Sequence, residues 1–359
     1  MRLPGSKRLY LMLPAAVFLL LALINPSVTL PRNMHNFIFV LDITGSMNVA
    51  DVGMDGRSMR RLEFGKQLVR KALDGMSCGS RAGLAVFTEH RTFMLFTPVE
   101  ICENHLVIST MIEAIDGRMA WAELSEVAKG LYSGIEAVSD LEAKDEGSAA
   151  GAANLVFLTD GHEAPPVHPT LRPRFRGEPG EVGGLIAGIG GSEPVPIPRV
   201  DEEGEVTGYW AQDEVMQVDR HSAGRPSTQG TEAMAGVDSA DLQARISQGA
   251  EHLSSLRESY LQTLATETGL EYLRTTTPDA FADALLNSGY ATRQRVETGI
   301  GWLPAALSLL CLAYLFGFQF LRARAGASHA DDASSGSVLS IVARETGSYG
   351  ARSRSSQTV

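Results

Sequence analysis

Two uncharged apolar stretches near the ends of the chain constrain its architecture more than any other feature. Leu9–Ile24 follows a short basic segment, and Ile300–Leu321 is 22 residues long. A helix of about 20 apolar residues crosses the hydrocarbon core of a bilayer. We therefore expect a transmembrane helix over residues 300–321. Residues 1–31 are expected to form a membrane anchor, with a cleaved signal peptide as the alternative.

Basic residues at the flanks of these stretches indicate the orientation. Three basic residues precede the first stretch, and Arg322 and Arg324 follow the second. Because cytosolic flanks are enriched in Lys and Arg, we expect both termini in the cytosol and the body of the chain outside. In a bacterium this places the protein in the inner membrane with its body in the periplasm. Residues 322–359, rich in Ser, Gly and Ala, are expected to form a disordered tail.

The charge of the body excludes one class of partner. The 359-residue chain has a formal net charge of −11, and residues 32–299 alone carry 39 acidic against 23 basic side chains. Proteins that bind nucleic acid cluster Lys and Arg to neutralise phosphates. The sequence therefore predicts no nucleic-acid binding.

Short apolar runs alternate with amphipathic segments through the body, which predicts an α/β fold with a doubly wound, mainly parallel sheet. A hairpin over residues 83–96 would add one antiparallel edge strand, and a second, smaller hairpin is expected within 194–210. The domain is expected over residues 32–292, with insertions near 162–183 and 191–251. The other expected strands are Asn36–Leu41, Asn154–Thr159, Gly184–Ile189 and Leu270–Leu273, and the expected helices cover 57–75, 124–138, 252–267 and the residues from Pro278 onward, capped by Thr277.

Two cysteines flank the predicted hairpin. In a hairpin the start of the first strand lies beside the end of the second, so Cys78 and Cys102 could meet. A disulfide between them would suit an oxidising compartment. The alternative is two separate small buried side chains.

Oxygen-bearing side chains follow two of the predicted strands. Asp42, Thr44 and Ser46 come directly after the first strand, and Asp160 follows another within Thr159–Gly161. Ligand sites of such sheets lie beyond the carboxyl ends of the strands. An oxygen-only site with few charges suits Mg²⁺, with Ca²⁺ or Mn²⁺ as alternatives, and leaves the cation able to accept a carboxylate from a partner protein.

In these motifs the chain resembles the von Willebrand factor A (VWA) family over about residues 33–290. The strings DITGSM and FLTDG carry the resemblance. It implies a metal-ion-dependent adhesion site (MIDAS) with Asp42, Thr44, Ser46 and Asp160, and the family's intervening Thr falls on Ser125. Ser125 keeps the hydroxyl but departs from the pattern, so a plain helix N-cap remains the alternative for it.

The two residues after Gly161 are candidates for an accessory role. His162 and Glu163 could add metal ligands or polarise the carboxylate of a bound partner. Solvated loop positions are the alternative interpretation for both.

The wider layout resembles bacterial membrane-anchored VWA proteins associated with MoxR-type AAA+ ATPases. The string FLTDGHEAPP is similar to the MxaL-like member of methanol-oxidation clusters. The resemblance implies assembly or maturation of a periplasmic complex, including metal insertion into methanol dehydrogenase. The implied partners are a MoxR-type ATPase system and a periplasmic dehydrogenase.

Two other functions compete with a binding module. A hard-metal site could perform phosphoryl transfer, but Thr44 stands where haloacid-dehalogenase phosphatases need a second Asp, and the sequence has no P-loop or dinucleotide fingerprint. The acidic body could also deliver or buffer Ca²⁺, although no D-x-D-x-D-G loop is present. We therefore expect a non-catalytic binding protein.

Overall fold

The computed structural model describes residues 5–54, 56–121, 124–144, 151–166, 172–215, 249–287, 289–314 and 316. The chain divides into two compact units. One is Pro31–Gln294, and the other combines Met1–Leu30 with Arg295–Val359.

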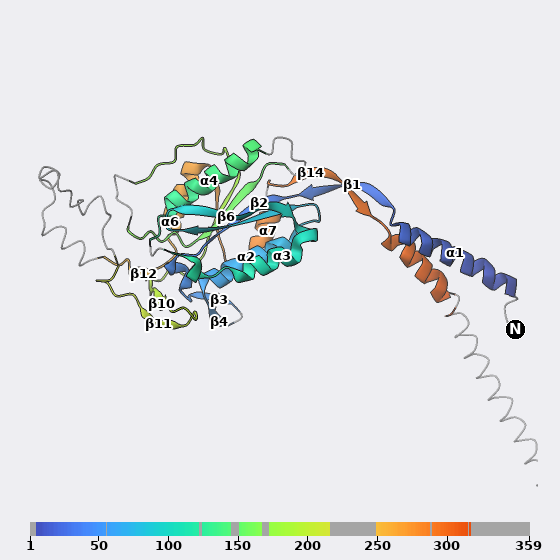
Figure 1. Cartoon of the computed structure of the whole chain (residues 1–359), viewed down its shortest axis with the longest axis horizontal. Helices are drawn as coiled ribbons and strands as arrows, with labels where there is room; N and C mark the ends of the chain where they lie inside the picture. The colour runs from blue at the N-terminus through green and yellow to red at the C-terminus, as the bar shows by residue number, and fades with distance from the viewer. Residues whose placement is uncertain are drawn as a thin grey trace, which may run out of the picture. The chain divides into compact units, whose positions relative to one another are not determined.

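A six-stranded sheet forms the centre of the first unit (Figure 1). Every neighbouring pair is parallel except the hairpin at one edge, so the predicted mainly parallel sheet with one antiparallel edge strand is confirmed. In spatial order the strands are β13 (Glu271–Arg274), β8 (Gly184–Gly188), β7 (Asn154–Thr159), β2 (Asn36–Asp42), β5 (Arg81–Thr88) and β6 (Arg91–Glu100).

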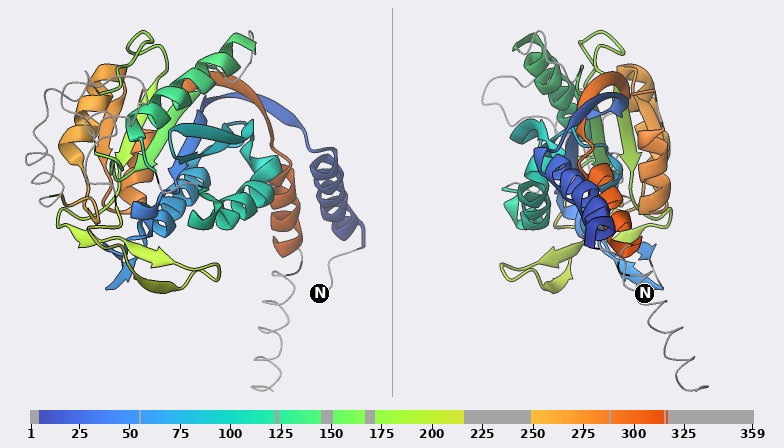
Figure 2. Two further views of the ribbon diagram at one scale, coloured as in Figure 1. Left: turned by 60° about the vertical axis from the view of Figure 1, so that its left-hand side comes forward. Right: turned by 90° about the vertical axis from the view of Figure 1, so that its right-hand side faces the viewer.

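Helices cover both faces of this sheet, as a doubly wound fold requires (Figures 1 and 2). All seven residues of β2 are buried, and successive side chains enter opposite cores: Phe39 packs into one cluster and Val40 into the other. The first core is closed by α2 (Arg61–Gly75), α3 (Ile101–Ala114) and α7 (Pro278–Leu286), and the second by α4 (Val127–Lys144) and α6 (Glu258–Thr268).

Two predicted helices begin later than the sequence suggested, because short strands occupy their expected first turns. Residues 57–59 form β4 (Arg57–Met59), which pairs with β3 (Val52–Met54). Leu253 and Ser254 form β12, which pairs with β9 (Val195–Pro196). Both pairings are set by partners outside the helical periodicity, so the apolar spacing alone could not indicate them.

The predicted small hairpin is present as β10 (Pro198–Val200) and β11 (Val206–Tyr209). Thr277 caps α7 as expected, since its hydroxyl accepts a hydrogen bond from the N–H of Ala280. Helix α3 was not predicted.

The second unit contains α1 (Gly5–Ile24) and helical residues 302–314. Within it, the Ser308 hydroxyl donates to the Ala15 carbonyl at 2.9 Å. β1 (Ser27–Met34) pairs with β14 (Thr292–Gly299). Among the described residues, no helix has the length and apolar content needed to cross a membrane. The two membrane segments therefore stay predictions, and the expected tail over 322–359 lies outside the described residues.

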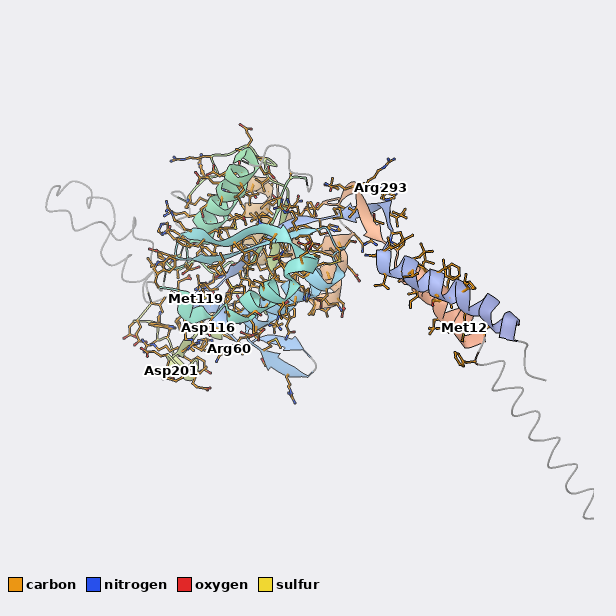
Figure 3. The ribbon with its side chains drawn as sticks, turned by 45° about the vertical axis from the view of Figure 1, so that its right-hand side comes forward. Met12, Arg60, Asp116, Met119, Asp201 and Arg293 are labelled. Carbon is orange, nitrogen blue, oxygen red and sulfur yellow. A yellow bond between two sulfur atoms is a disulfide. The ribbon has the colours of Figure 1, made fainter. Side chains whose placement is uncertain are left out.

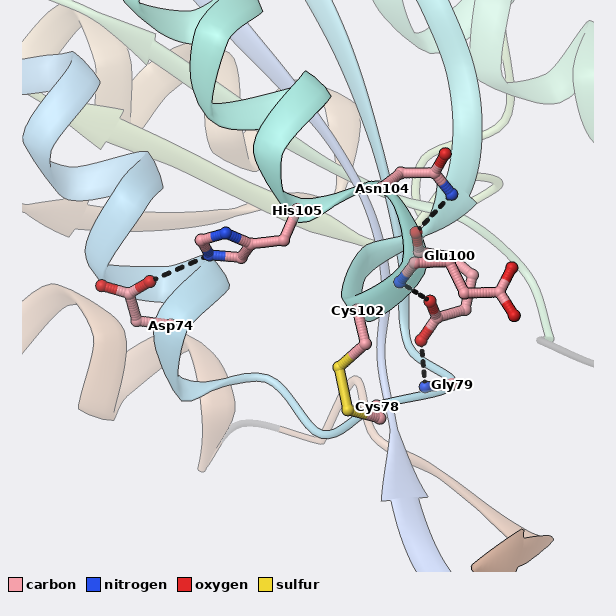
Figure 4. The surroundings of a disulfide bond; sticks show 8 residues. Asp74, Cys78, Gly79, Glu100, Cys102, Asn104 and His105 are labelled. Carbon is pink, nitrogen blue, oxygen red and sulfur yellow. Dashed lines mark hydrogen bonds and ion pairs between the residues drawn. A yellow bond between two sulfur atoms is a disulfide. The ribbon is translucent and has the colours of Figure 1, made fainter.

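A disulfide joins Cys78 to Cys102, with their Cα atoms 5.3 Å apart (Figure 4). It links the chain before β5 to the first turn of α3. Beside it, the Glu100 carboxylate accepts hydrogen bonds from the N–H groups of Gly79 and Glu103, which caps α3. The base of the hairpin is thus held both covalently and by hydrogen bonds.

Candidate metal centre

Two neighbouring parallel strands bring the two predicted acids to the same edge of the sheet. β2 ends with Asp42, and Asp160 directly follows its neighbour β7. Both side chains are fully buried. Gly161 then adopts a left-handed backbone conformation (φ 76°), which turns the chain back so that the His162 N–H reaches the Asp160 carboxylate at 2.9 Å.

The hydroxyls of the DITGS loop donate their protons to these carboxylates. Thr44 Oγ1 donates to Asp42 Oδ1 at 2.7 Å, and Ser46 Oγ donates to Asp160 Oδ1 at 3.1 Å. The two hydroxyl oxygens lie 3.5 Å apart. The other oxygen of Asp42 accepts from the Thr159 hydroxyl at 2.6 Å. Since each hydroxyl proton is bound to an acid, the lone pairs of Thr44 and Ser46 are left for another ligand.

Ser125 belongs to the same assembly. Its backbone exchanges two hydrogen bonds with Ala164, and its hydroxyl donates to the His162 carbonyl at 2.8 Å. It does not cap α4 through its side chain: the N–H of Ala128 is bound by the Glu163 carboxylate at 3.0 Å. The third hydroxyl is therefore tied to the loop that carries Asp160.

A cleft of about 730 Å³ opens over these hydroxyls. Thr44, Ser46 and Ser125 contribute to its lining, whereas the lining does not include Asp42 or Asp160. The floor of the cleft thus presents neutral oxygens, with the two carboxylates behind them.

This donor set fits a hard divalent cation. All five predicted ligands are oxygen donors, and carboxylate and hydroxyl oxygens are what Mg²⁺ and similar ions prefer. Burial and the neighbouring charge of Asp160 raise the pKa of Asp42 to about 7. A cation at the floor would relieve this repulsion. The structure brings the five residues together, and their role as ligands stays a prediction.

A buried arginine that the sequence did not predict lies behind the site. The Arg61 guanidinium is fully buried, pairs with Asp160, and binds Asp51 at 2.6 and 2.8 Å. Its Nη1 also donates to the Ser254 hydroxyl at 2.6 Å. Burial acts to raise the pKa of Asp160, but the Arg61 charge and local hydrogen bonds outweigh it and lower that pKa. Arg61 thus stabilises the ionised form of one of the two acids.

The two accessory candidates differ in their surroundings, although neither is a solvated loop position. Glu163 is buried, accepts from the Tyr260 hydroxyl at 2.6 Å, and caps α4. Burial raises the pKa of its carboxyl to about 7. His162 lines the cleft with only 2% of its surface exposed, and burial lowers its pKa to about 4.

Comparisons with known proteins give structural similarity only. No protein-family model and no curated protein matches the chain. A solved structure of an aerotolerance-related membrane protein from Bacteroides fragilis is 19% identical, with a TM-score of 0.42, and the match covers 70% of this chain and 98% of that one. BatB from Bacteroides thetaiotaomicron is 17% identical, covering 70% and 96%, with a TM-score of 0.42. A von Willebrand factor type A protein from Catenulispora acidiphila is 9% identical, covering 73% and 44%, with a TM-score of 0.34.

Proposed function

We propose that this chain is a membrane-tethered VWA-type module that binds a protein partner through a divalent cation. Thr44, Ser46 and Ser125 would hold the ion, with Asp42 and Asp160 behind them. Mg²⁺ is the proposed ion, and Ca²⁺ or Mn²⁺ could take its place. When bound, the cation supplies an electrophilic centre that accepts a carboxylate from the partner.

One observation carries the proposal: two of the hydroxyls that line the cleft have their protons bound to buried carboxylates. Thr44 donates to Asp42, and Ser46 donates to Asp160. The oxygens facing the cleft are therefore neutral, and the negative charge lies behind them. A cation held this way keeps much of its positive charge, which favours an anionic ligand from outside.

The same geometry favours binding over catalysis. A nucleophilic aspartate needs a carboxylate oxygen that faces its substrate. Both oxygens of Asp42 accept hydrogen bonds, from Thr44 and Thr159, and Asp42 does not line the cleft. We therefore propose a non-catalytic role.

The proposed setting is the periplasmic side of the bacterial inner membrane, with both termini in the cytosol. The Cys78–Cys102 disulfide supports an oxidising compartment. The MoxR-associated layout and the string FLTDGHEAPP in the sequence support a role in assembling or maturing a periplasmic complex. Candidate partners are a MoxR-type ATPase system and a dehydrogenase that requires metal insertion.

The test compares partner capture by the full-length chain and its variants. Asp42→Asn removes a carboxylate at nearly constant size and should abolish capture of membrane and periplasmic partners, and EDTA should have the same effect on the wild type. Asp140→Asn, an exposed acid on α4, is the matched control and should capture normally. Circular dichroism checks that each variant is folded. Recovery of the same partners by Asp42→Asn and in EDTA would contradict the proposal.

A further inference from the structure

His162 is a buried polar side chain whose ring nitrogens are poorly satisfied. Among the described residues, neither Nδ1 nor Nε2 makes a hydrogen bond of normal geometry, although the Glu251 backbone interacts weakly with the ring. The carboxylate of Glu251 lies 3.9 Å from Nε2, which is beyond hydrogen-bond distance. Leaving a buried polar group unsatisfied costs about 1–3 kcal/mol. Such a group in the lining of a cleft points to a ligand that completes it.

The backbone of His162 is fixed by the candidate metal centre itself. Its N–H donates to Asp160 Oδ1, and its carbonyl accepts from Ser125 Oγ. The residue is therefore bracketed by a carboxylate and a hydroxyl of the site. Its ring lines the same cleft as Thr44 and Ser46. The imidazole thus lines the cleft from a backbone that is fixed at the candidate metal centre.

We propose that His162 is a second recognition group, which donates a hydrogen bond to one oxygen of the partner's carboxylate while the other oxygen meets the cation. The inference rests on the proposed function and specifies how that site selects its ligand. A carboxylate has two oxygens, each of which can make a separate interaction, whereas an amide has only one acceptor oxygen. His162 would thus favour an acid over its amide.

The cleft walls indicate what surrounds that acid. Among the residues that line the cleft, Trp121 is 60% exposed, and Arg199 stacks 4.1 Å over the Trp210 ring. Exposed Trp and Arg side chains are typical of the energetic centres of protein interfaces. The favoured ligand is therefore a protein loop with an acidic side chain next to an apolar one.

Arg60 gives this cleft a further cationic group. Arg60 and Asp116 both line the cleft, and both are labelled in Figure 3. The Arg60 guanidinium donates to the Gly204 carbonyl at 2.8 Å, and no carboxylate pairs with it among the residues the structure describes. Arg118, by contrast, is paired with Asp116. Arg60 is thus held by a backbone carbonyl within the acidic segment 201–205 and not by an ion pair.

The experiment uses full-length protein, Mn²⁺ and two short peptides. The probes are acetyl-Gly-Asp-Leu-Gly-amide and its Asn counterpart, which differ only in the carboxylate. Mn²⁺ affinity is measured by electron paramagnetic resonance without peptide, and peptide affinity by calorimetry on the Mn²⁺-loaded protein. His162→Ala should leave the Kd for Mn²⁺ within about twofold and weaken the Asp peptide about tenfold, the effect expected for one hydrogen bond to a charged group. His162→Gln, which keeps a donor, should retain most of the affinity.

The remaining outcomes of this experiment would contradict the inference about His162 or the proposed function. Weaker Mn²⁺ binding by His162→Ala without peptide would make the imidazole a metal ligand and overturn the inference. Unchanged affinity for both Mn²⁺ and the Asp peptide in both folded variants would also overturn it, because the side chain would be merely structural. If wild-type protein binds Mn²⁺ but does not distinguish the Asp from the Asn peptide, the proposed function fails as well. Thermal unfolding of both variants checks the fold.

Discussion

At the scale of single residues, the buried charge of Asp160 is balanced by the Arg61 guanidinium. Asp42 and Asp160 both follow apolar runs of the sequence, and the pairing of β2 with β7 brings them together. Arg61 stands next to Arg60 at the start of an amphipathic helix, a pattern typical of solvated surface. Its partner Asp160 is 99 residues away, and only the tertiary fold reveals the pair.

We predict that Arg61→Gln makes the stability of the protein depend more strongly on metal. Removing one partner of a buried ion pair leaves uncompensated charge, so in EDTA the free energy of unfolding should fall by about 3–5 kcal/mol. Mn²⁺ should then raise the Tm of the variant more than that of the wild type, because Asp160 is no longer neutralised by the guanidinium. Differential scanning calorimetry with and without Mn²⁺ measures both effects.

Arg60→Gln is the matched control for this prediction, since the Arg60 guanidinium donates to the Gly204 carbonyl and pairs with neither Asp51 nor Asp160. It should change the Mn²⁺-dependent shift of Tm by little. An equal Mn²⁺ shift in Arg61→Gln and wild type would show that Arg61 does not compete with the cation.

At the scale of elements, strands that run through the core were predictable and locally ambiguous segments were not. The continuous apolar runs of β2, β7 and β8 can only be buried on both faces. Helix α3 was missed because its apolar residues are not confined to one face: Ile108 and Ile112 are buried, but Leu106 is 79% and Val107 62% exposed. With apolar and polar residues mixed around the helix, the segment shows no clear helical period.

The cap of α4 predicts a pH dependence. Because the pKa of Glu163 rises from 4.5 to about 7 on folding, the folded state holds the proton more tightly. This contribution to stability is present below pH 4.5 and is lost as the pH rises through 7. In Glu163→Gln the amide oxygen can still accept from Ala128 and Tyr260. The free energy of unfolding of Glu163→Gln relative to wild type, measured by urea unfolding, should therefore rise by at most about 3 kcal/mol from pH 5 to pH 8.

Glu136→Gln, at an exposed position of the same helix α4, controls for the loss of a surface charge. Its difference from wild type should be the same at both pH values. If Glu163→Gln loses equal stability at pH 5 and pH 8, the Glu163 carboxyl is ionised throughout and the predicted pH dependence is absent.

At the scale of the whole molecule, the orientation across the membrane rests on sequence, and the disulfide provides a means of testing it. The Cys78–Cys102 pair should be oxidised in cells if the body faces an oxidising compartment. In a Cys311→Ser background, acid-trapped protein should gain no maleimide label without reductant and two labels after reduction. Cys78→Ser, which leaves Cys102 unpaired, shows that the labelling works. Two labels without reductant would place the body in a reducing compartment.

The acidic tip of the β10–β11 hairpin bears on how the proposed partner would approach the cleft. Asp201, Glu202, Glu203 and Glu205 crowd five consecutive positions there. The guanidiniums of Arg60 and Arg118 hold this tip through the Gly204 and Glu202 carbonyls. Four acids repel an approaching acidic loop well before contact, over roughly a Debye length of 8 Å in physiological salt. We therefore expect the hairpin tip to disfavour the approach of an acidic partner from its own side of the cleft.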